Sequence, residues 1–323
     1  MSDAVPQLET IAITLFPSGV AELAFNRPQR YNALSPQAYR DWLSAITWAA
    51  NDDRVKVTIL TGRGKYYTSG QELTMPDFSD ENLPAELERR QKTTHDVVQE
   101  MIRFPKLLIA AVNGPSIGFG TTTLALCDVV YAAPDATFTT PFMKLGFCAE
   151  GCSSVLFPRI MGPSRANEML LLGRTFTAKE MEDCGFVSRI IPKENFREQI
   201  LAIAEDASAF SPEAMRVTKD LIRENERKFL EQVNDVEMER LAERMASPDS
   251  LKSILKFVES SKKRKKAKLQ PAPAQLKIFD QCKQNEDNYL KTCTQSDYAC
   301  LCKCYNYSVA DAKGILLGYM SQR

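Results

Sequence analysis

The sequence predicts an α/β protein that continues into a helical C-terminal region. Apolar runs of strand length alternate with helix-forming segments in the first half, and helical spacing of apolar residues prevails after Glu150. The composition, 44% hydrophobic and 25% charged over 323 residues, is that of an ordinary globular chain. We predict a core over residues 1–200, a helical region over 201–269, and a linker with a cysteine-rich extension over 270–323.

Local signals predict each element of the first half. The runs IAITLF and VAELAF have strand character and flank a Pro-Ser-Gly turn at 17–19. Ser35-Pro36 predicts a helix start, because serine caps a helix N-terminus and proline fits the first helical position. The following elements are, in order, the rest of that helix (YRDWLSAITWAAN), a buried strand (VKVTIL), a polar helix (Pro84 to about Phe104), a second buried strand (KLLIAAVNG), a helix of small residues (Ile117–Leu126) and a strand (DVVYAA).

The second half reads as helices alone. Apolar residues at helical spacing predict helices over Lys193–Ala209, Pro212–Asn225 and roughly Phe229–Met245. Pro248 begins a last helix, which ends in the basic run KKRKKAK at 262–268. The composition QPAPAQ at 270–275 then indicates a linker.

Charge and hydropathy exclude several classes of protein. The 41 basic residues balance the 41 acidic ones, but the basic run carries six of the positive charges, so the rest is mildly acidic and lacks a nucleic-acid footprint. The start MSDAVPQLET has neither a basic segment nor an apolar one, so we expect no secretory leader. No apolar stretch approaches the roughly 20 residues that span a bilayer, so we expect the first 270 residues to be soluble and intracellular, without a membrane span.

Several apparent catalytic motifs lack the other residues that their chemistry requires. The segment G-P-S-I-G at 114–118 fits a serine-hydrolase elbow, but the single histidine, His95, lies upstream of Ser116 instead of downstream. The segment G-R-G-K at 62–65 lacks the other residues of a phosphate-binding loop, and no G-x-G-x-x-G follows a strand. The cysteines lack the spacing of a metal site, so we expect no metal.

Two glycine-rich turns remain, TSGQEL at 68–73 and NGPSIGFG at 113–120, and each follows a buried strand. Glycine lets the main chain approach a ligand closely, and the second turn opens a helix whose first N–H groups are free. Two such N–H groups aimed at one point would form an oxyanion hole. The alternative is that these glycines only shape tight turns.

These turns belong to a larger set of motifs. NRPQRYNAL at 26–34, the turn TSGQEL, AAVNGPSIGFG followed by LALCDVVYA, and FTTPFMKLGFCAEGCSS together resemble the crotonase, or enoyl-CoA hydratase/isomerase, superfamily. The resemblance covers roughly residues 8–269 and rests on several ordered motifs. It implies a spiral of β-β-α units with a C-terminal helical trimerisation region, a homotrimer or homohexamer, and an acyl-CoA thioester as substrate. Coenzyme A is then part of the substrate, so no separate cofactor is expected.

The resemblance also assigns the oxyanion hole. Its two donors would be the main-chain N–H groups of Gln71 and Phe119. The neighbouring residues would line the thioester and pantetheine site: Ser69, Gly70, Glu72, Leu73 and Gly118. Two aimed donors in a dry pocket contribute on the order of several kcal/mol to a transition state in which charge collects on the thioester oxygen.

The acid/base residues divide the superfamily by reaction. At the positions where the resembling hydratases carry two glutamates, this chain has Thr122 and Phe142. KLGFCAEGCSS at 144–154 instead resembles the segment of peroxisomal Δ3,Δ2-enoyl-CoA isomerases whose glutamate is the base, which corresponds to Glu150. Cys152, in place of a glycine, and Gln71, in place of a small residue, depart from that pattern.

The implied reaction is a Δ3,Δ2-enoyl-CoA isomerisation in fatty-acid β-oxidation. Glu150 would move a proton from C2 to C4 through a dienolate, and an apolar surrounding that includes Phe142, Gly146 and Phe147 would raise its proton affinity. The alternatives are a hydratase-like enzyme of secondary metabolism, including toxin biosynthesis, a non-catalytic acyl-CoA-binding protein, and a Glu150 that only complements a helix dipole.

The C-terminal part combines a peroxisomal address with an extension. Ala267-Lys268-Leu269 resembles the small-basic-leucine signal, which the peroxisomal import receptor reads at a free C-terminus. We expect a peroxisomal enzyme of 269 residues that fusion, splicing or a faulty gene model has extended. The extension holds five of the nine cysteines and faintly resembles small fungal cell-surface modules; without an export signal we expect it to stay reduced and poorly ordered.

Overall fold

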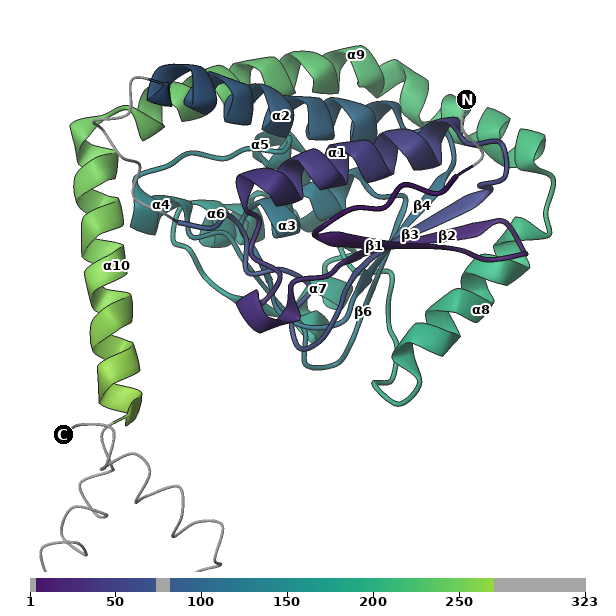
Figure 1. Cartoon of the computed structure of the whole chain (residues 1–323), viewed down its shortest axis with the longest axis horizontal. Coiled ribbons are helices and arrows are strands. Elements are labelled where there is room, and N and C mark those ends of the chain that lie inside the picture. Colours follow the sequence, from purple (N-terminus) through teal and green to yellow (C-terminus); the bar gives the residue numbers. More distant parts are fainter. Residues whose placement is uncertain (1–3, 74–81, 270–323) are drawn as a thin grey trace, which may run out of the picture. The chain divides into compact units, whose positions relative to one another are not determined.

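The computed structural model describes residues 4–73 and 82–269 (Figure 1). The described residues up to Ile254 form one compact unit, and α10 from Leu255 onward belongs to a second. The elements are β1 Ile11–Leu15, β2 Val20–Phe25, η1 Pro28–Arg30, α1 Pro36–Asn51, β3 Val57–Gly62, α2 Leu83–Arg103, β4 Leu107–Val112, β5 Ser116–Ile117, α3 Phe119–Thr122, η2 Thr123–Leu126, β6 Val129–Ala132, β7 Thr137–Thr139, α4 Phe142–Leu145, α5 Ser153–Met161, α6 Pro163–Leu170, β8 Phe176–Thr177, α7 Ala178–Asp183, β9 Arg189–Ile190, α8 Phe196–Ser208, α9 Pro212–Met245 and α10 Pro248–Leu269.

A six-stranded sheet with the order β1-β2-β3-β4-β6-β9 forms the centre of the first unit. β1 pairs antiparallel with β2, and every later pair is parallel. All six residues of β2 and of β3 are buried, as expected for central parallel strands that are covered on both faces. A smaller sheet, β5-β7-β8, begins within the second glycine turn, because β5 is Ser116–Ile117.

Helices cover both faces of the large sheet (Figure 1). On one face, α8 contributes Phe196, Ile200 and Ala204 to an apolar cluster with Val57 and Ile109 of the sheet. On the other face, α1 buries Trp42 completely against the sheet, and α2 and α9 pack beyond it. The site residues lie on turns that leave this rigid framework.

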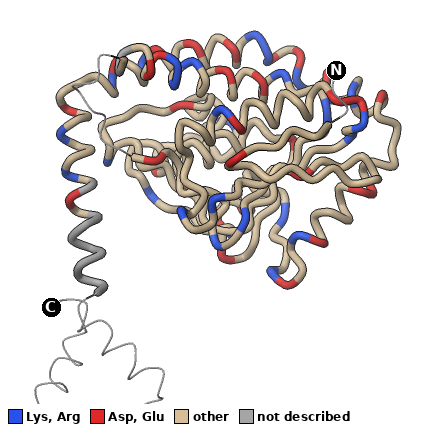
Figure 2. The backbone as a smooth tube through the Cα atoms, viewed as in Figure 1, with Lys and Arg blue, Asp and Glu red and all other residues tan. Residues whose placement is uncertain are grey.

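Ion pairs connect the outer helices of this unit, where acidic and basic residues are interspersed (Figure 2). Arg103 of α2 pairs with Glu231 of α9 at 2.7 Å, and His95 of α2 contacts Asp235 of α9 at 2.8 Å. None of the helices in the described ranges combines the length and hydropathy needed to cross a membrane.

The predicted start of α1 is confirmed by its cap. Ser35 accepts a hydrogen bond from the backbone N–H of Ala38 at 3.2 Å, and Pro36 occupies the first helical position. The predicted strand VAELAF is also confirmed residue by residue as β2. Both features depend on local chemistry, which a short stretch of sequence already contains.

Other predictions were wrong in length or number. The two helices predicted over 212–245 are a single 34-residue helix, α9, because the segment between them contains no glycine or proline to end it. The helix predicted over Ile117–Leu126 begins two residues later, at Phe119, and changes to a 3-10 helix at Thr123. The short strands β7, β8 and β9 were missed, since two or three residues carry no periodic signal.

The predicted linker and cysteine-rich extension lie outside the described residues, which end at Leu269. The tripeptide Ala267-Lys268-Leu269 forms the last residues of α10.

Candidate active site

Asn32 connects the NRPQRYNAL motif to the loop that leads from β3 into the first glycine turn. Its backbone is left-handed, with φ of 54°, and its buried side-chain amide donates to the carbonyl oxygens of Arg63 at 2.9 Å and Tyr66 at 2.8 Å. Asparagine tolerates the left-handed region better than most residues do. The backbone carbonyl oxygen of Asn32 accepts a hydrogen bond from the hydroxyl of Thr68 at 2.6 Å. The motif therefore holds the start of the turn TSGQEL.

Leu34 of the same motif fixes the middle of that turn. Its N–H donates to the carbonyl oxygen of Gly70 at 2.9 Å, and its own carbonyl oxygen accepts from the N–H of Glu72 at 3.0 Å. This parallel bridge uses the residues on either side of Gln71 and leaves its N–H outside the ladder.

The two glycine turns lie side by side. Thr68 and Ser116 form a parallel bridge, in which the N–H of Ile117 donates to the carbonyl oxygen of Thr68 at 3.1 Å. Gly70 has φ of 76°, and a Cβ atom at this position would lie 2.6 Å from the carbonyl oxygen of Ile117 and 3.7 Å from the nitrogen of Gly118. Only glycine permits this approach, so the absence of a side chain at residue 70 brings the turns together.

Phe119 begins α3 directly after Gly118, whose φ is 58°. As the first residue of a helix, Phe119 has an N–H without a partner inside that helix. Within residues 4–73 and 82–269, no hydrogen bond is made by the N–H of Gln71 or of Phe119 to a protein acceptor. The side chain of Phe119 is buried, whereas that of Gln71 is exposed.

The other residues expected to line the first turn differ in their contacts. Ser69 is half-buried, and its N–H donates to the carbonyl oxygen of Tyr31 at 2.9 Å. Glu72 pairs with Arg27 at 2.9 Å and also with Arg30. Burial by itself would raise the pKa of Glu72, but the two guanidinium groups lower it below its usual value. Leu73 is half-buried and ends this described range.

Glu150 is buried, with 4% of its surface exposed. Its Oε1 atom lies 3.1 Å from the hydroxyl of Thr122, while Oε2 has no partner among the described residues. Phe142 and Phe147, which the sequence placed around it, are also buried. Burial and the negative charge of Glu237 raise the pKa of Glu150 to about 8, against the opposing hydrogen bond from Thr122.

Thr122 links the carboxyl group of Glu150 to the second glycine turn. Besides Glu150, its hydroxyl lies 3.1 Å from the carbonyl oxygen of Phe119. Tyr39 of α1 closes the cluster: its ring centroid is 5.2 Å from that of Phe119, and the charge of Glu150 adds to burial in raising its pKa. The position that carries a glutamate in the resembling hydratases thus holds a hydroxyl that contacts the candidate base.

A left-handed turn follows Glu150. Gly151 has φ of 66°, and a Cβ atom there would lie 2.8 Å from the Thr122 hydroxyl oxygen. Cys152 has φ of 61° and is fully buried, so it adopts the backbone conformation of the glycine that it replaces. Sequence reasoning missed Tyr39 and Glu237 as members of this cluster, because both are distant in the chain and neither belongs to a recognisable motif.

The rejected serine-hydrolase alternative also fails geometrically. Ser116 is buried and accepts the hydroxyl of Thr121 at 3.1 Å, while His95 binds Asp235 on the outer helices. Among the described residues, no group of three or more His, Cys, Asp or Glu side chains is arranged for a metal ion.

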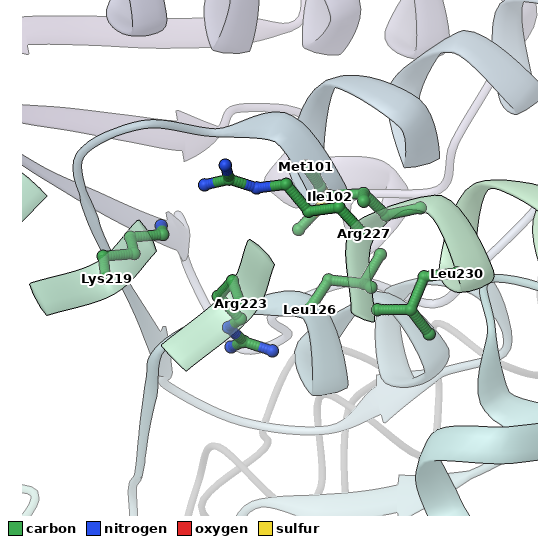
Figure 3. Close-up of a pocket in the computed structure, with 7 residues that line it drawn as sticks. All are labelled: Met101, Ile102, Leu126, Lys219, Arg223, Arg227 and Leu230. Atoms are coloured by element: carbon green, nitrogen blue, oxygen red, sulfur yellow. The ribbon is translucent and has the colours of Figure 1, made fainter. Parts of the chain in front are cut away.

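One small cavity lies away from these residues. It has a volume of about 10 Å³ and lies between α2, η2 and α9, as Figure 3 shows. Its lining includes none of the predicted site residues; it consists of Met101, Ile102, Leu126, Lys219, Arg223, Arg227 and Leu230. This volume is at the lower limit for one water molecule, so it does not provide a substrate site.

Comparisons with known proteins agree with the geometry. Residues 16–267 match the family model for enoyl-CoA hydratase/isomerase. Enoyl-CoA delta isomerase 2 of Rattus norvegicus is 38% identical over 240 residues, 74% of this chain and 61% of the relative. The peroxisomal enoyl-CoA delta isomerase 3 of Mus musculus is 38% identical over 240 residues, 74% of this chain and 75% of the relative.

A solved structure agrees as well. The crystal structure of an enoyl-CoA hydratase/isomerase from Pseudoalteromonas atlantica T6c aligns with a TM-score of 0.69 and 28% identity, covering 78% of this chain and 98% of that one. The chain therefore belongs to the enoyl-CoA hydratase/isomerase family and has the crotonase fold. Its relatives include enoyl-CoA delta isomerases. The chain spans about three fifths of the length of the rat protein.

The close contact of the two turns can be tested with a glycine pair. Gly70 and Gly185 have similar backbones, with φ of 76° and 80°, but a Cβ atom at Gly185 would meet nothing within 4 Å. We expect Gly185→Ala to cost about 1 kcal/mol through backbone strain alone, and Gly70→Ala about 3 kcal/mol because a backbone carbonyl must also move. Thermal unfolding of both variants measures the difference; equal losses would show that the turns are not in contact.

Proposed function

We propose that this protein is a Δ3,Δ2-enoyl-CoA isomerase, acting in fatty-acid β-oxidation. The observation that carries the proposal is the buried carboxyl group of Glu150, next to the second of two adjacent turns. Its pKa of about 8 suits a group that must take up and release a proton near neutral pH. The isomerase names of relatives at 38% identity support the same reaction.

The thioester oxygen would accept hydrogen bonds from the main-chain N–H groups of Gln71 and Phe119. Ionised Glu150 removes a proton from C2 of the 3-enoyl thioester, and the electron pair spreads over C2, C3, C4 and the thioester oxygen. The two N–H groups stabilise the charge on that oxygen. Protonated Glu150 then returns the proton to C4, so that the double bond lies between C2 and C3 and no co-reactant is consumed.

Thr122 suits both protonation states of Glu150. Its hydroxyl has one proton, which it can donate to ionised Glu150 at 3.1 Å or to the carbonyl oxygen of Phe119 at the same distance. When Glu150 carries the proton, the Thr122 oxygen can accept a hydrogen bond from the carboxyl group, while the Thr122 hydroxyl donates to the carbonyl oxygen of Phe119. The carboxyl group thereby keeps a partner throughout the proton transfer.

The base assignment predicts the effect of Glu150→Gln on the full chain. We expect kcat for conversion of 3-hexenoyl-CoA to the 2-enoyl thioester to fall by a factor on the order of 10³, because glutamine cannot accept the C2 proton. In the unaltered protein, kcat/KM should rise as the pH increases through about 8, where the carboxyl group ionises.

Glu231→Gln provides the control, since it removes a carboxylate from the outer surface of α9. It should leave the rate unchanged. A Glu150→Gln variant as active as the unaltered protein would refute the base assignment. Efficient hydration of crotonyl-CoA would favour the hydratase alternative, and thioester binding without turnover would favour the non-catalytic one.

We also propose that the chain assembles as a homotrimer, or as a homohexamer built from two trimers. The family resemblance suggests this assembly, and exposed apolar side chains on α9 offer a surface for it. Ile222, Phe229 and Val236 repeat every seven residues, which places them on one face of the helix, and Leu221 is 71% exposed beside them.

Analytical ultracentrifugation of the full chain tests the assembly. We expect a particle of three or six times the 36.3 kDa chain mass, and a shift to monomer in the double variant Leu221→Glu, Ile222→Glu. Leu172→Glu is the control, because Leu172 is similarly exposed but lies outside α9. A monomeric unaltered chain would contradict the proposal.

We further propose a peroxisomal location, directed by Ala267-Lys268-Leu269. The peroxisomal name of the mouse relative supports this location. A chain stopped after Leu269 and fused at its N-terminus to a fluorescent protein should enter peroxisomes, because the signal is read at a free C-terminus. The 323-residue chain should enter poorly, unless it assembles with subunits that end at Leu269. A diffuse signal from the shorter chain would exclude this address.

A further inference from the structure

A second buried carboxyl group has no part in the proposed chemistry. Glu237 of α9 is 6% exposed and forms no ion pair with a described lysine, arginine or histidine. Burying a carboxylate without a cation costs several kcal/mol unless hydrogen bonds compensate for the lost water. A carboxylate retained at such a place needs a structural or functional explanation.

The partners of Glu237 are two backbone N–H groups at the start of α5. Its Oε2 atom accepts from Cys152 at 2.7 Å, and its Oε1 atom accepts from Ser154 at 3.0 Å. The N–H groups of a first helical turn have no partner within the helix, and the helix dipole favours a negative charge there. Glu237 therefore caps α5 from a position more than 80 residues later in the chain.

This cap acts on the turn that carries Glu150. Between Glu150 and α5 lie only Gly151 and Cys152, both left-handed. A left-handed residue other than glycine costs about 1 kcal/mol or more and persists only where its surroundings hold it. Two polar groups of Cys152 bind α9: the N–H donates to Glu237, and the thiol donates to the carbonyl oxygen of Leu230 at 3.4 Å.

The far side of the turn is held by its own chain. The carbonyl oxygen of Glu150 accepts from the N–H of Ser153 at 3.3 Å and from its hydroxyl at 2.7 Å. The carbonyl oxygen of Glu150 is thus fixed by Ser153, while Cys152 and Ser154 bind Glu237 of α9. A shift of Glu237 would change the direction of the Glu150 side chain.

Glu237 also supplies charge to the same cluster. The titratable groups that act on Glu150 or on its immediate neighbours are Tyr39 from α1, Glu237 and Arg244 from α9, and Cys148 and Cys152 from the turn itself. Of these, Glu237 is the charged group that acts with burial to raise the pKa of Glu150. Burial raises the pKa of Glu237 itself, and the N–H groups of Ser154 and Cys152 oppose this shift by stabilising its ionised form.

We propose that Glu237 is a positioning residue: from α9 it clamps the turn that aims the carboxyl group of Glu150, and it sets the charge that this group faces. This inference rests on the proposed function, in which Glu150 moves the proton. Glu237 itself contacts neither the substrate nor the reacting atoms.

The test compares two substitutions on the same helix of the full chain. Glu237→Gln keeps the size of the side chain but removes its charge and one of its two acceptor atoms. Glu243→Gln, the control, changes an exposed carboxylate that pairs with Arg240. We measure kcat and KM for 3-hexenoyl-CoA across pH for both variants and for the unaltered protein.

For Glu237→Gln we expect the midpoint of the acid side of the kcat/KM profile to move to lower pH by about one pH unit, because the negative charge is gone. At the alkaline plateau, kcat should fall on the order of tenfold, since the base is less well aimed, while KM changes little. The control should follow the unaltered protein. A helix cap with only a structural role would leave the midpoint in place.

A second measurement does not need turnover. With glutamate labelled by ¹³C at Cδ, the carboxyl signal of Glu150 is assigned by its loss in Glu150→Gln, and its titration is compared with and without Glu237→Gln. An unaltered protein without isomerase activity would refute the proposed function and leave this comparison intact. An unchanged Glu150 midpoint in Glu237→Gln would refute the role of Glu237.

Glu237→Asp covers the case in which the glutamine variant does not fold. Aspartate keeps the charge but is shorter by one methylene group, so it cannot reach both N–H groups. We expect the Glu150 midpoint to stay near that of the unaltered protein while the plateau kcat falls. An unchanged plateau kcat in this variant would overturn the positioning role.

Discussion

The burial of one carboxyl group, that of Glu150, is the constraint on which the site depends. A carboxylate with a single hydroxyl partner is costly to place in an apolar cluster, and the cost appears as a pKa raised to about 8. A carboxyl group with such a pKa would suit the proposed role of a base, because it can both take up and release a proton near neutral pH. Because folding raises this pKa, the contribution of Glu150 to the free energy of unfolding falls as the pH increases towards about 8.

The surrounding structure reads as a set of devices that hold this group and the two turns in place. Asn32 and Leu34 hold the first turn from below, and the missing side chain of Gly70 lets the second turn approach it. Thr122 connects the second turn to Glu150. The hydrogen bonds of Thr122, and the one between Thr68 and Asn32, are buried, and hydrogen bonds are electrostatically stronger in such a place than in water.

Much of the candidate site could be predicted because its signals are short and contiguous. The NRPQRYNAL motif, the glycines of both turns and the segment around Glu150 could be read from the sequence, and so could the cap of α1 at Ser35. What could not be predicted involves partners far apart in the chain. Tyr39 joins the cluster from α1 and Glu237 from α9, and no local pattern marks either residue. The two-residue strands were missed for a related reason, since packing decides them.

The sequence by itself determined which groups are available: two turns that only glycine can form, one carboxylate in an apolar segment, and a family resemblance that orders them. Only the tertiary structure decided their relations. It placed Gly70 against Ile117, turned Glu150 inward to Thr122, and brought Glu237 across from α9 to cap the helix that follows Glu150. The physical reason is that conformational preference is local and readable in a few residues, whereas burial and charge depend on every segment that packs against a group.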